Sequence, residues 1–255
     1  MKRAGVVLSL VVVLFGGALA VLSCGGGGGG GQEPSVALFA DTEYVQYDES
    51  DNEAEASNVM RTLQHLGIEA TAFTGISASA FSAALSGRTV LAFPELDPFL
   101  LKLAPALSDS AIAVIHDFVQ DGGTMILFSG ERVDSSIADT VFGWNIPLGS
   151  EHPNDWQAYL DTTVAAGTSF AGGPSAIANQ GQITNYQTSP LPAGSKVVYG
   201  TSTAQSSVTV MPYGSGQVIH LGWDWSWWAW TYPASPITTG QDGGWFEVLD
   251  RAVRY

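Results

Sequence analysis

Four acidic residues and one serine in this 255-residue chain each follow a short apolar run, the place where an open α/β sheet binds its ligands. The acids are Asp41, Glu95, Glu131 and Asp224, and the serine is Ser129. Converging carboxylates accept hydrogen bonds from hydroxyl groups, or repel one another until a proton or a cation relieves the repulsion. Isolated acids at such positions are also commonly solvated or cap helices. If the apolar runs are neighbouring strands, these five residues form one ligand site.

Tryptophans are concentrated at the last of these positions. Trp223 and Trp225 flank Asp224, and five tryptophans fall within the eight residues 223–230. Indole rings cover apolar sugar faces and form hot spots in protein interfaces. Neighbours in an extended segment point to opposite sides, so we expect about half of the rings in the core and the rest exposed. We predict that Trp223 and Trp225 form an aromatic wall of the site.

Ser129 also suggests nucleophilic chemistry, with a histidine as its base. Its segment FSG lacks the first glycine of the G-x-S-x-G elbow. His220 lies inside an apparent strand, one residue out of alternation with the position of a base, and His152 lies in a loop-rich region. His65 and His116 fall on amphipathic helices. We therefore favour structural histidines over a catalytic triad and predict no catalytic residue.

No metal or cofactor motif is recognisable in the sequence. Residues 47–53 (YDESDNE) are acidic but lack the spacing and the glycine of a calcium-binding EF-hand loop. Acids that lead into a helix are favoured by the helix dipole, and this is the better explanation of the stretch. We predict neither a metal nor a cofactor.

Cys24 is the only cysteine, and it follows a segment typical of export. Lys2 and Arg3 precede an uncharged stretch rich in Val and Leu, which ends in VLSC at residues 21–24. The segment resembles a bacterial lipoprotein signal peptide, whose cleavage leaves an acylated cysteine. We predict a signal peptide over residues 1–23, lipidation of Cys24 and a glycine-rich tether over residues 24–33. The alternative is an uncleaved helix, since about 19 uncharged residues can span a bilayer.

The charge of the chain excludes some partners. Its formal net charge is −15, which disfavours binding to nucleic acid and electrostatic attraction to anionic lipids. Attachment to a membrane should therefore depend on acyl chains. Gly25 stands where an aspartate retains some bacterial lipoproteins in the inner membrane, so this similarity favours the outer membrane, facing the periplasm or the exterior.

Apolar runs alternate with helical periods over residues 34–142. Strands are predicted at residues 35–40, 68–73, 88–93 and 124–128, with helices between them. The clearest helix begins after Ser108 as its N-cap and ends at Gly122. This rhythm predicts an open, mostly parallel flavodoxin-like α/β sheet with helices on both faces.

The second half of the chain departs from this rhythm. Residues 143–195 are rich in Gly, Pro, Ser, Thr and Asn, which indicates a loop-rich insertion with short antiparallel strands. Further strands are predicted at residues 196–200, 207–211 and 217–221, and the turn YGSG favours an antiparallel hairpin between the last two. A helix over residues 243–255 completes a single domain over residues 34–255.

Three segments resemble the class I glutamine amidotransferase-like superfamily: residues 91–96 (LAFPEL), 112–130 (IAVIHDFVQDGGTMILFSG) and 216–225 (GQVIHLGWDW). In its active members a cysteine follows the fourth strand at a sharp elbow, a His-Pro-Glu ends a late strand, and a glycine-rich oxyanion loop follows the third strand. Here the corresponding segments are Ser129-Gly130, Gly222-Trp223-Asp224 and Pro94-Glu95-Leu96. The resemblance implies the fold and argues against glutamine hydrolysis.

The sequence thus predicts a lipid-anchored protein of the cell envelope that binds or scaffolds and is not an enzyme. Carboxylates and indoles suit a glycan, and a protein partner is also compatible with them. One alternative is a divergent hydrolase of envelope carbohydrate or peptide, which in the glycosidase case needs two carboxyl groups about 5 to 9 Å apart. The other is a structural subunit of an envelope complex, marked by an exposed apolar patch.

Overall fold

The computed structural model covers the domain that follows the predicted tether. It describes residues 33–51, 53–97, 100, 102–129, 134–153, 157–178, 182–201, 204–225, 230–231, 235–236 and 242–255. The predicted signal peptide, Cys24 and Glu131 lie outside the described residues. Within these ranges, no helix has the length and apolar character needed to cross a membrane.

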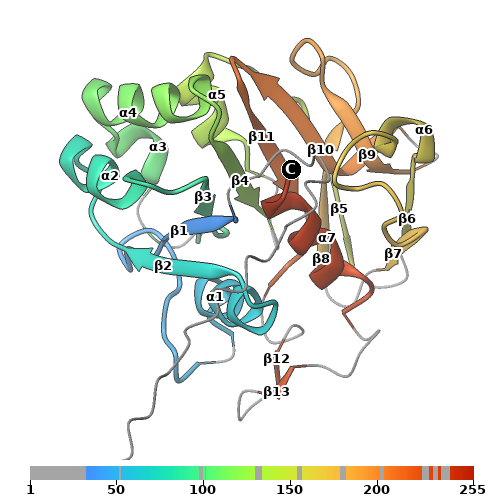
Figure 1. Ribbon diagram of the computed structural model, residues 1–255, viewed down its shortest axis with the longest axis horizontal. Coiled ribbons are helices and arrows are strands. Elements are labelled where there is room, and N and C mark those ends of the chain that lie inside the picture. Colours follow the sequence, from blue (N-terminus) through green and yellow to red (C-terminus); the bar gives the residue numbers. More distant parts are fainter. Residues whose placement is uncertain are drawn as a thin grey trace, which may run out of the picture. The chain divides into compact units, whose positions relative to one another are not determined.

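A mixed sheet of 11 strands runs through the domain, with helices on both of its faces (Figure 1). Its central part is parallel, in the order β2 (Glu69–Phe73), β1 (Ser35–Phe39), β3 (Val90–Phe93), β4 (Thr124–Phe128), β11 (Gly216–Leu221). Thr124 of β4 is aligned with both Val90 and Gln217, so these strands begin at one level and their carboxyl ends form one edge. The predicted α/β fold class is confirmed.

The rest of the sheet is antiparallel. β10 (Gln205–Tyr213) and β11 form the predicted hairpin around residues 213–216. The sheet then continues through β9 (Lys196–Gly200), β6 (Gln157–Leu160) and β7 (Ala176–Ala178), while β8 (Gln182–Gln187) pairs with both β10 and β5 (Leu148–Pro153). The strands of the predicted insertion therefore extend the main sheet. A separate two-stranded sheet joins β12 (Trp230–Thr231) to β13 (Ser235–Pro236).

Alternation along the central strands divides the core between two helical layers. Val36 and Leu38 of β1 pack in the layer of α1 (Glu55–His65) and α7 (Trp245–Val253). Ala37 and Phe39 pack in the other layer, whose helices are α2 (Ala78–Leu85), α3 (Leu103–Ala106), α4 (Asp109–Gln120) and α5 (Ser136–Phe142). A short α6 (Thr162–Ala165) lies against β9. The side chains of one strand thus supply both layers.

The helix signals in the sequence correspond to real caps. Ser108 Oγ accepts the N–H of Ala111 at 3.2 Å and so begins α4. The acidic stretch before α1 stays a loop, because Asp48 accepts the N–H of Ser50 at 2.8 Å and Asp51 accepts the N–H of Glu53 at 2.9 Å. These hydrogen bonds lower the pKa of Asp48. The stretch therefore turns the chain ahead of the helix, and α1 begins only at Glu55.

Candidate functional site

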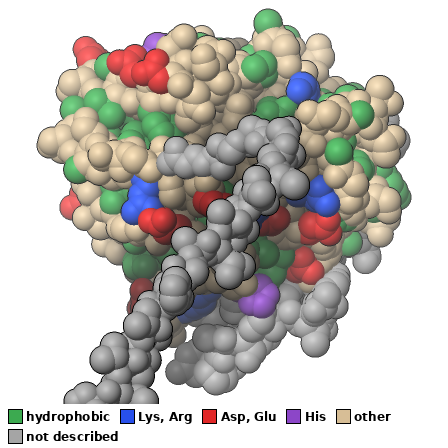
Figure 2. Space-filling model, in the orientation of Figure 1, with side chains coloured by type: hydrophobic (Ala, Val, Ile, Leu, Met, Phe, Trp, Pro, Cys, Tyr) green, Lys and Arg blue, Asp and Glu red, His purple; other side chains and the backbone are tan. Residues whose placement is uncertain are grey.

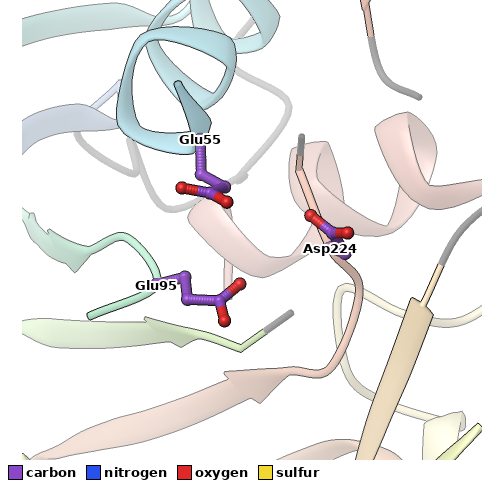
Figure 3. Close-up of side chains that lie close together, drawn as sticks. All are labelled: Glu55, Glu95 and Asp224. Carbon is purple, nitrogen blue, oxygen red and sulfur yellow. The ribbon is translucent and has the colours of Figure 1, made fainter. Parts of the chain in front are cut away.

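Three carboxylates meet at the carboxyl end of the sheet (Figure 3). Glu95 follows β3, Asp224 follows β11, and Glu55 is the first residue of α1. Their side chains point toward one another, and one oxygen from each lies within 4.8 Å of the others. The three residues are 9%, 6% and 3% exposed, in the order Glu55, Glu95, Asp224. We call these three residues the carboxylate cluster.

Strand β8 positions Asp224 by crossing the end of β11. The N–H of Thr184 donates to the carbonyl oxygen of Gly222 at 2.7 Å, and the N–H of Asp224 donates to that of Gln182 at 3.0 Å. A Cβ atom at Gly222 would run into the carbonyl oxygen of Thr184. Only glycine therefore allows the two chains to approach closely enough to place Asp224 in the cluster.

Glu95 and Asp224 were predicted from the sequence, and Glu55 was missed. Glu55 belongs to a helix that follows β1, and such a crossover helix begins at the carboxyl edge of a parallel sheet. The first residue of that helix was therefore a signal that could have found it. A carboxylate there is also favoured by the positive end of the helix dipole.

The cluster has limited chemical possibilities. Three carboxylates this close repel one another, and shared protons or a bound hard cation relieve such repulsion. Their separation is below the roughly 5 to 9.5 Å that glycosidases require between their two carboxyl groups. Their burial leaves no sugar-sized space between them. The geometry therefore argues against a glycosidase centre.

Beside this cluster, Ser129 Oγ lies 2.9 Å from Nε2 of His220. His220 is aligned with Leu127 across the β4–β11 pair, and Ser129 lies two residues beyond Leu127 on the same side of the sheet. The expectation that His220 projects away from Ser129 is therefore wrong, because Ser129 continues the alternation of β4. Both residues are buried, and the ring of Tyr186 stacks on His220 with centroids 3.8 Å apart.

The environment of His220 makes it a weak base. Burial lowers its pKa to about 3, because a charged imidazole would lose its hydration. Within the part of the chain that the structure describes, Nδ1 of His220 has no hydrogen-bond partner. A catalytic triad needs an acidic group at that nitrogen to orient the ring and stabilise its charge. The Ser129–His220 pair lacks this feature.

The other predicted site residues lie apart from the cluster. Asp41 accepts the N–H of Gly75 at 2.8 Å and that of Glu43 at 3.1 Å, so it ties together the loops that follow β1 and β2. It does not reach the carboxylate cluster. Glu131 lies outside the described residues.

Trp223 and Trp225 are buried in the core. The ring of Trp223 stacks on Trp245 of α7 at 5.9 Å, and the ring of Trp225 meets Phe128 edge-on at 5.0 Å. Trp225 Nε1 also donates to Thr62 Oγ1 of α1 at 3.2 Å. The expected aromatic wall is corrected accordingly, because both rings face the layer of α1 and α7.

Comparison with known proteins shows the fold. The sequence matches no protein-family model, and no curated protein matches it. In structure, 87% of the chain matches 91% of a ThuA-like protein from Bacteroides uniformis, with a TM-score of 0.53 and 11% identity. A GMP synthase protein from Thermoplasma acidophilum matches 88% of the chain over 96% of its own length, with a TM-score of 0.50 and 12% identity. The chain has a glutamine amidotransferase-like fold.

Within this amidotransferase-like fold, Ser129 holds the elbow after β4, where active members of the superfamily carry a cysteine. The fold also occurs inside longer proteins. A β-galactosidase from Bacillus circulans sp. alkalophilus matches 86% of this chain, with a TM-score of 0.51 and 12% identity. The chain spans only 30% of that enzyme, and identities this low relate the folds alone.

Proposed function

We propose that this protein is a non-catalytic binding or scaffold domain of the cell envelope, held at a membrane by lipid on Cys24. The buried Ser129–His220 pair is the observation that carries the proposal. A nucleophile must meet its substrate, yet Ser129 is 1% exposed. Its neighbour His220, with a pKa of about 3, stays neutral at pH 7 and attracts a proton weakly.

The space around the end of β4 supports the same conclusion. The cavity there, lined in part by Phe93, Leu127 and Phe128, has a volume of about 10 Å³. That is room for one water molecule at most. Trp223 and Trp225 fill the neighbouring volume. A packed edge of this kind suits a domain that offers its outer surfaces to a partner.

The anchor is proposed from the sequence. Cys24 is followed by an uninterrupted glycine run at residues 25–31, which would hold the domain roughly 15 Å from the acyl chains as a flexible tether. The proposed location is the outer membrane, facing the periplasm or the exterior. The partner would be a glycan or a protein. Figure 2 shows acidic side chains on the viewed face with few basic ones among them, which disfavours nucleic acid.

Fractionation of cells that express the full chain tests the anchor. We expect the native protein in the membrane pellet, with an N-terminal peptide that begins at an acylated Cys24. The Cys24→Ser variant should lose the acyl mass and leave the pellet, whereas a matched Ser23→Ala variant should keep both. An unmodified Cys24 in a chain that still begins at Met1 would reject lipidation.

A divergent hydrolase is the second candidate, favoured by the 2.9 Å contact between Ser129 and His220. Turnover by the full chain of p-nitrophenyl esters, glutamine and short envelope peptides separates the two proposals. A binding domain gives the same background rate for the native protein and for Ser129→Ala. Turnover that Ser129→Ala removes would establish the hydrolase and overturn the non-catalytic proposal.

A further inference from the structure

A polar groove lies between β5, β8 and β10, apart from the carboxylate cluster. Its volume is about 430 Å³, within the roughly 300 to 1,000 Å³ typical of small-molecule sites. Five of the seven described residues that line it carry a hydroxyl or an amide group: Ser150, Gln187, Thr188, Ser189 and Gln205. We propose that this groove binds a neutral oligosaccharide.

The groove occupies the side of the sheet where ligands of α/β folds bind. Val208 of β10 pairs with Leu221, the last residue of β11, and Gln205 lies three residues earlier on β10. Because the two strands are antiparallel, Gln205 lies beyond the carboxyl end of β11. Gln187 is aligned with Gln205, so β8 carries the groove along the same edge.

The walls of the groove are held in place by hydrogen bonds. Ser150 Oγ donates to Gln205 Oε1 at 2.6 Å, and Gln187 Nε2 donates to the carbonyl oxygen of Leu148 at 2.9 Å. The N–H of Thr188 donates to the carbonyl oxygen of Ala204 at 3.0 Å. Ala204 has a φ of 58°, a left-handed conformation that is unfavourable for a residue with a Cβ atom. Such strain is retained mainly at functional sites.

The chemistry of the lining selects a neutral, hydrogen-bonding ligand. Hydroxyl and amide groups both donate and accept, as sugar hydroxyls do. No charged side chain occurs among the described lining residues, although the chain carries a net charge of −15. A charged ligand would therefore find no counter-charge in the groove. Leu148, beside Gly149 of the lining, is 45% exposed and offers an apolar contact to the C–H face of a sugar.

This inference rests on the proposed binding function and gives it a ligand class and a site. The two can still fail separately. Hydrolysis that depends on Ser129 would overturn the non-catalytic proposal and leave sugar binding in the groove intact. Absence of sugar binding would overturn the groove assignment and leave both the anchor and a protein partner standing.

Isothermal titration of the full chain in detergent tests the groove. The probes are the neutral hexasaccharides cellohexaose, maltohexaose and N-acetylchitohexaose, with hexagalacturonate as the acidic comparison. We expect at least one neutral probe to bind with a Kd of about 1 mM or tighter, and hexagalacturonate to bind more weakly. Failure of all three neutral probes to bind, or tighter binding of the acidic one, would overturn the inference.

Two variants with matched controls locate the binding. Thr188→Arg fills the groove and should abolish binding, whereas Thr163→Arg on exposed α6 should not change it. Gln187→Ala removes one lining amide and should weaken binding about tenfold, while Gln157→Ala, at an exposed strand position where Gln157 accepts a hydrogen bond from Tyr159, should leave it unchanged. If Thr188→Arg does not fold, Gln187→Ala alone decides. Binding unaffected by the groove variants would place the sugar elsewhere and overturn the assignment.

Discussion

Ser129 Oγ and His220 Nε2 lie 2.9 Å apart, and their side chains join two neighbouring parallel strands. Serine and histidine at this distance commonly act as nucleophile and base. Here both are buried, and His220 is kept neutral by its surroundings. The contact therefore satisfies two polar groups inside the core, and its main consequence should be stability.

Ser129→Ala should lower the free energy of unfolding by about 1 to 3 kcal/mol, because it leaves Nε2 of His220 buried without a partner. Urea denaturation measures the change. Ser207→Ala is the matched control, since Ser207 is equally buried and donates to Asn185 Oδ1 at 2.8 Å. We expect similar losses from both. A gain in stability for Ser129→Ala alone would speak for an active-site residue, because such residues are often held at a cost in stability.

His220 should make stability fall as the pH is lowered from neutral. Its pKa is about 3 in the folded state and 6.5 in its ordinary state, so between these values the unfolded chain binds a proton that the folded chain does not. Its contribution is complete above pH 6.5 and declines by about 1.4 kcal/mol per pH unit toward pH 3. In urea titrations at pH 7, 6 and 5, His220→Gln should show a shallower slope than the native protein. Equal slopes would mean that His220 titrates normally.

Glu95→Gln should raise the melting temperature in the presence of a chelator. The change removes one of three like charges within 4.8 Å while it keeps the shape of the side chain. Each kcal/mol regained corresponds to about 2 to 4 °C for a domain of this size. The control is Glu43→Gln at an exposed position, which should have little effect. If calcium or magnesium stabilises the native protein and Glu95→Gln removes that effect, the cluster holds a cation and this prediction is wrong.

Gly222→Ala should destabilise the domain by about 3 kcal/mol, because its Cβ would press on the carbonyl oxygen of Thr184 and neither strand can move freely. Gly167→Ala is the comparison, since the new Cβ would meet open space there. Its cost of about 1 kcal/mol would come only from its φ of +77°. Chemical denaturation of the two variants distinguishes close packing from backbone strain. Equal losses would show that β8 does not hold the segment after β11.

Trp223→Ala should cost about 3 to 5 kcal/mol, as expected for a large ring removed from a packed core. Trp144, a partly exposed ring beside Phe142, serves as the control and should cost much less. The measurement is again the free energy of unfolding. A small loss at Trp223, together with lost ligand affinity, would restore the idea of an aromatic wall.

The fold could be predicted because its signals are local and periodic. The cap at Ser108, the apolar stripe of α4 and the turn before β11 each follow from a few neighbouring residues. Glu95 and Asp224 could be predicted because parallel strands end at one edge. Glu55 could not be found in the same way, since its acidic neighbours concealed it among residues that turn the chain.

Alternation explains two further differences between sequence and structure. It indicates that Trp223 and Trp225 share one side of the chain, but it does not reveal whether that side faces the core or a ligand. The position of His220 relative to Ser129 depends on the register between β4 and β11, which no local pattern encodes. Both outcomes are set by contacts between distant parts of the chain.

Fluorophosphonate labelling tests most directly whether the Ser129–His220 pair is structural. The folded full chain is exposed to the probe at pH 7, and modified serines are mapped by mass spectrometry. We predict no more labelling at Ser129 than at the buried Ser207. Rapid labelling of Ser129 that His220→Gln abolishes would contradict this prediction and identify Ser129 as a catalytic nucleophile.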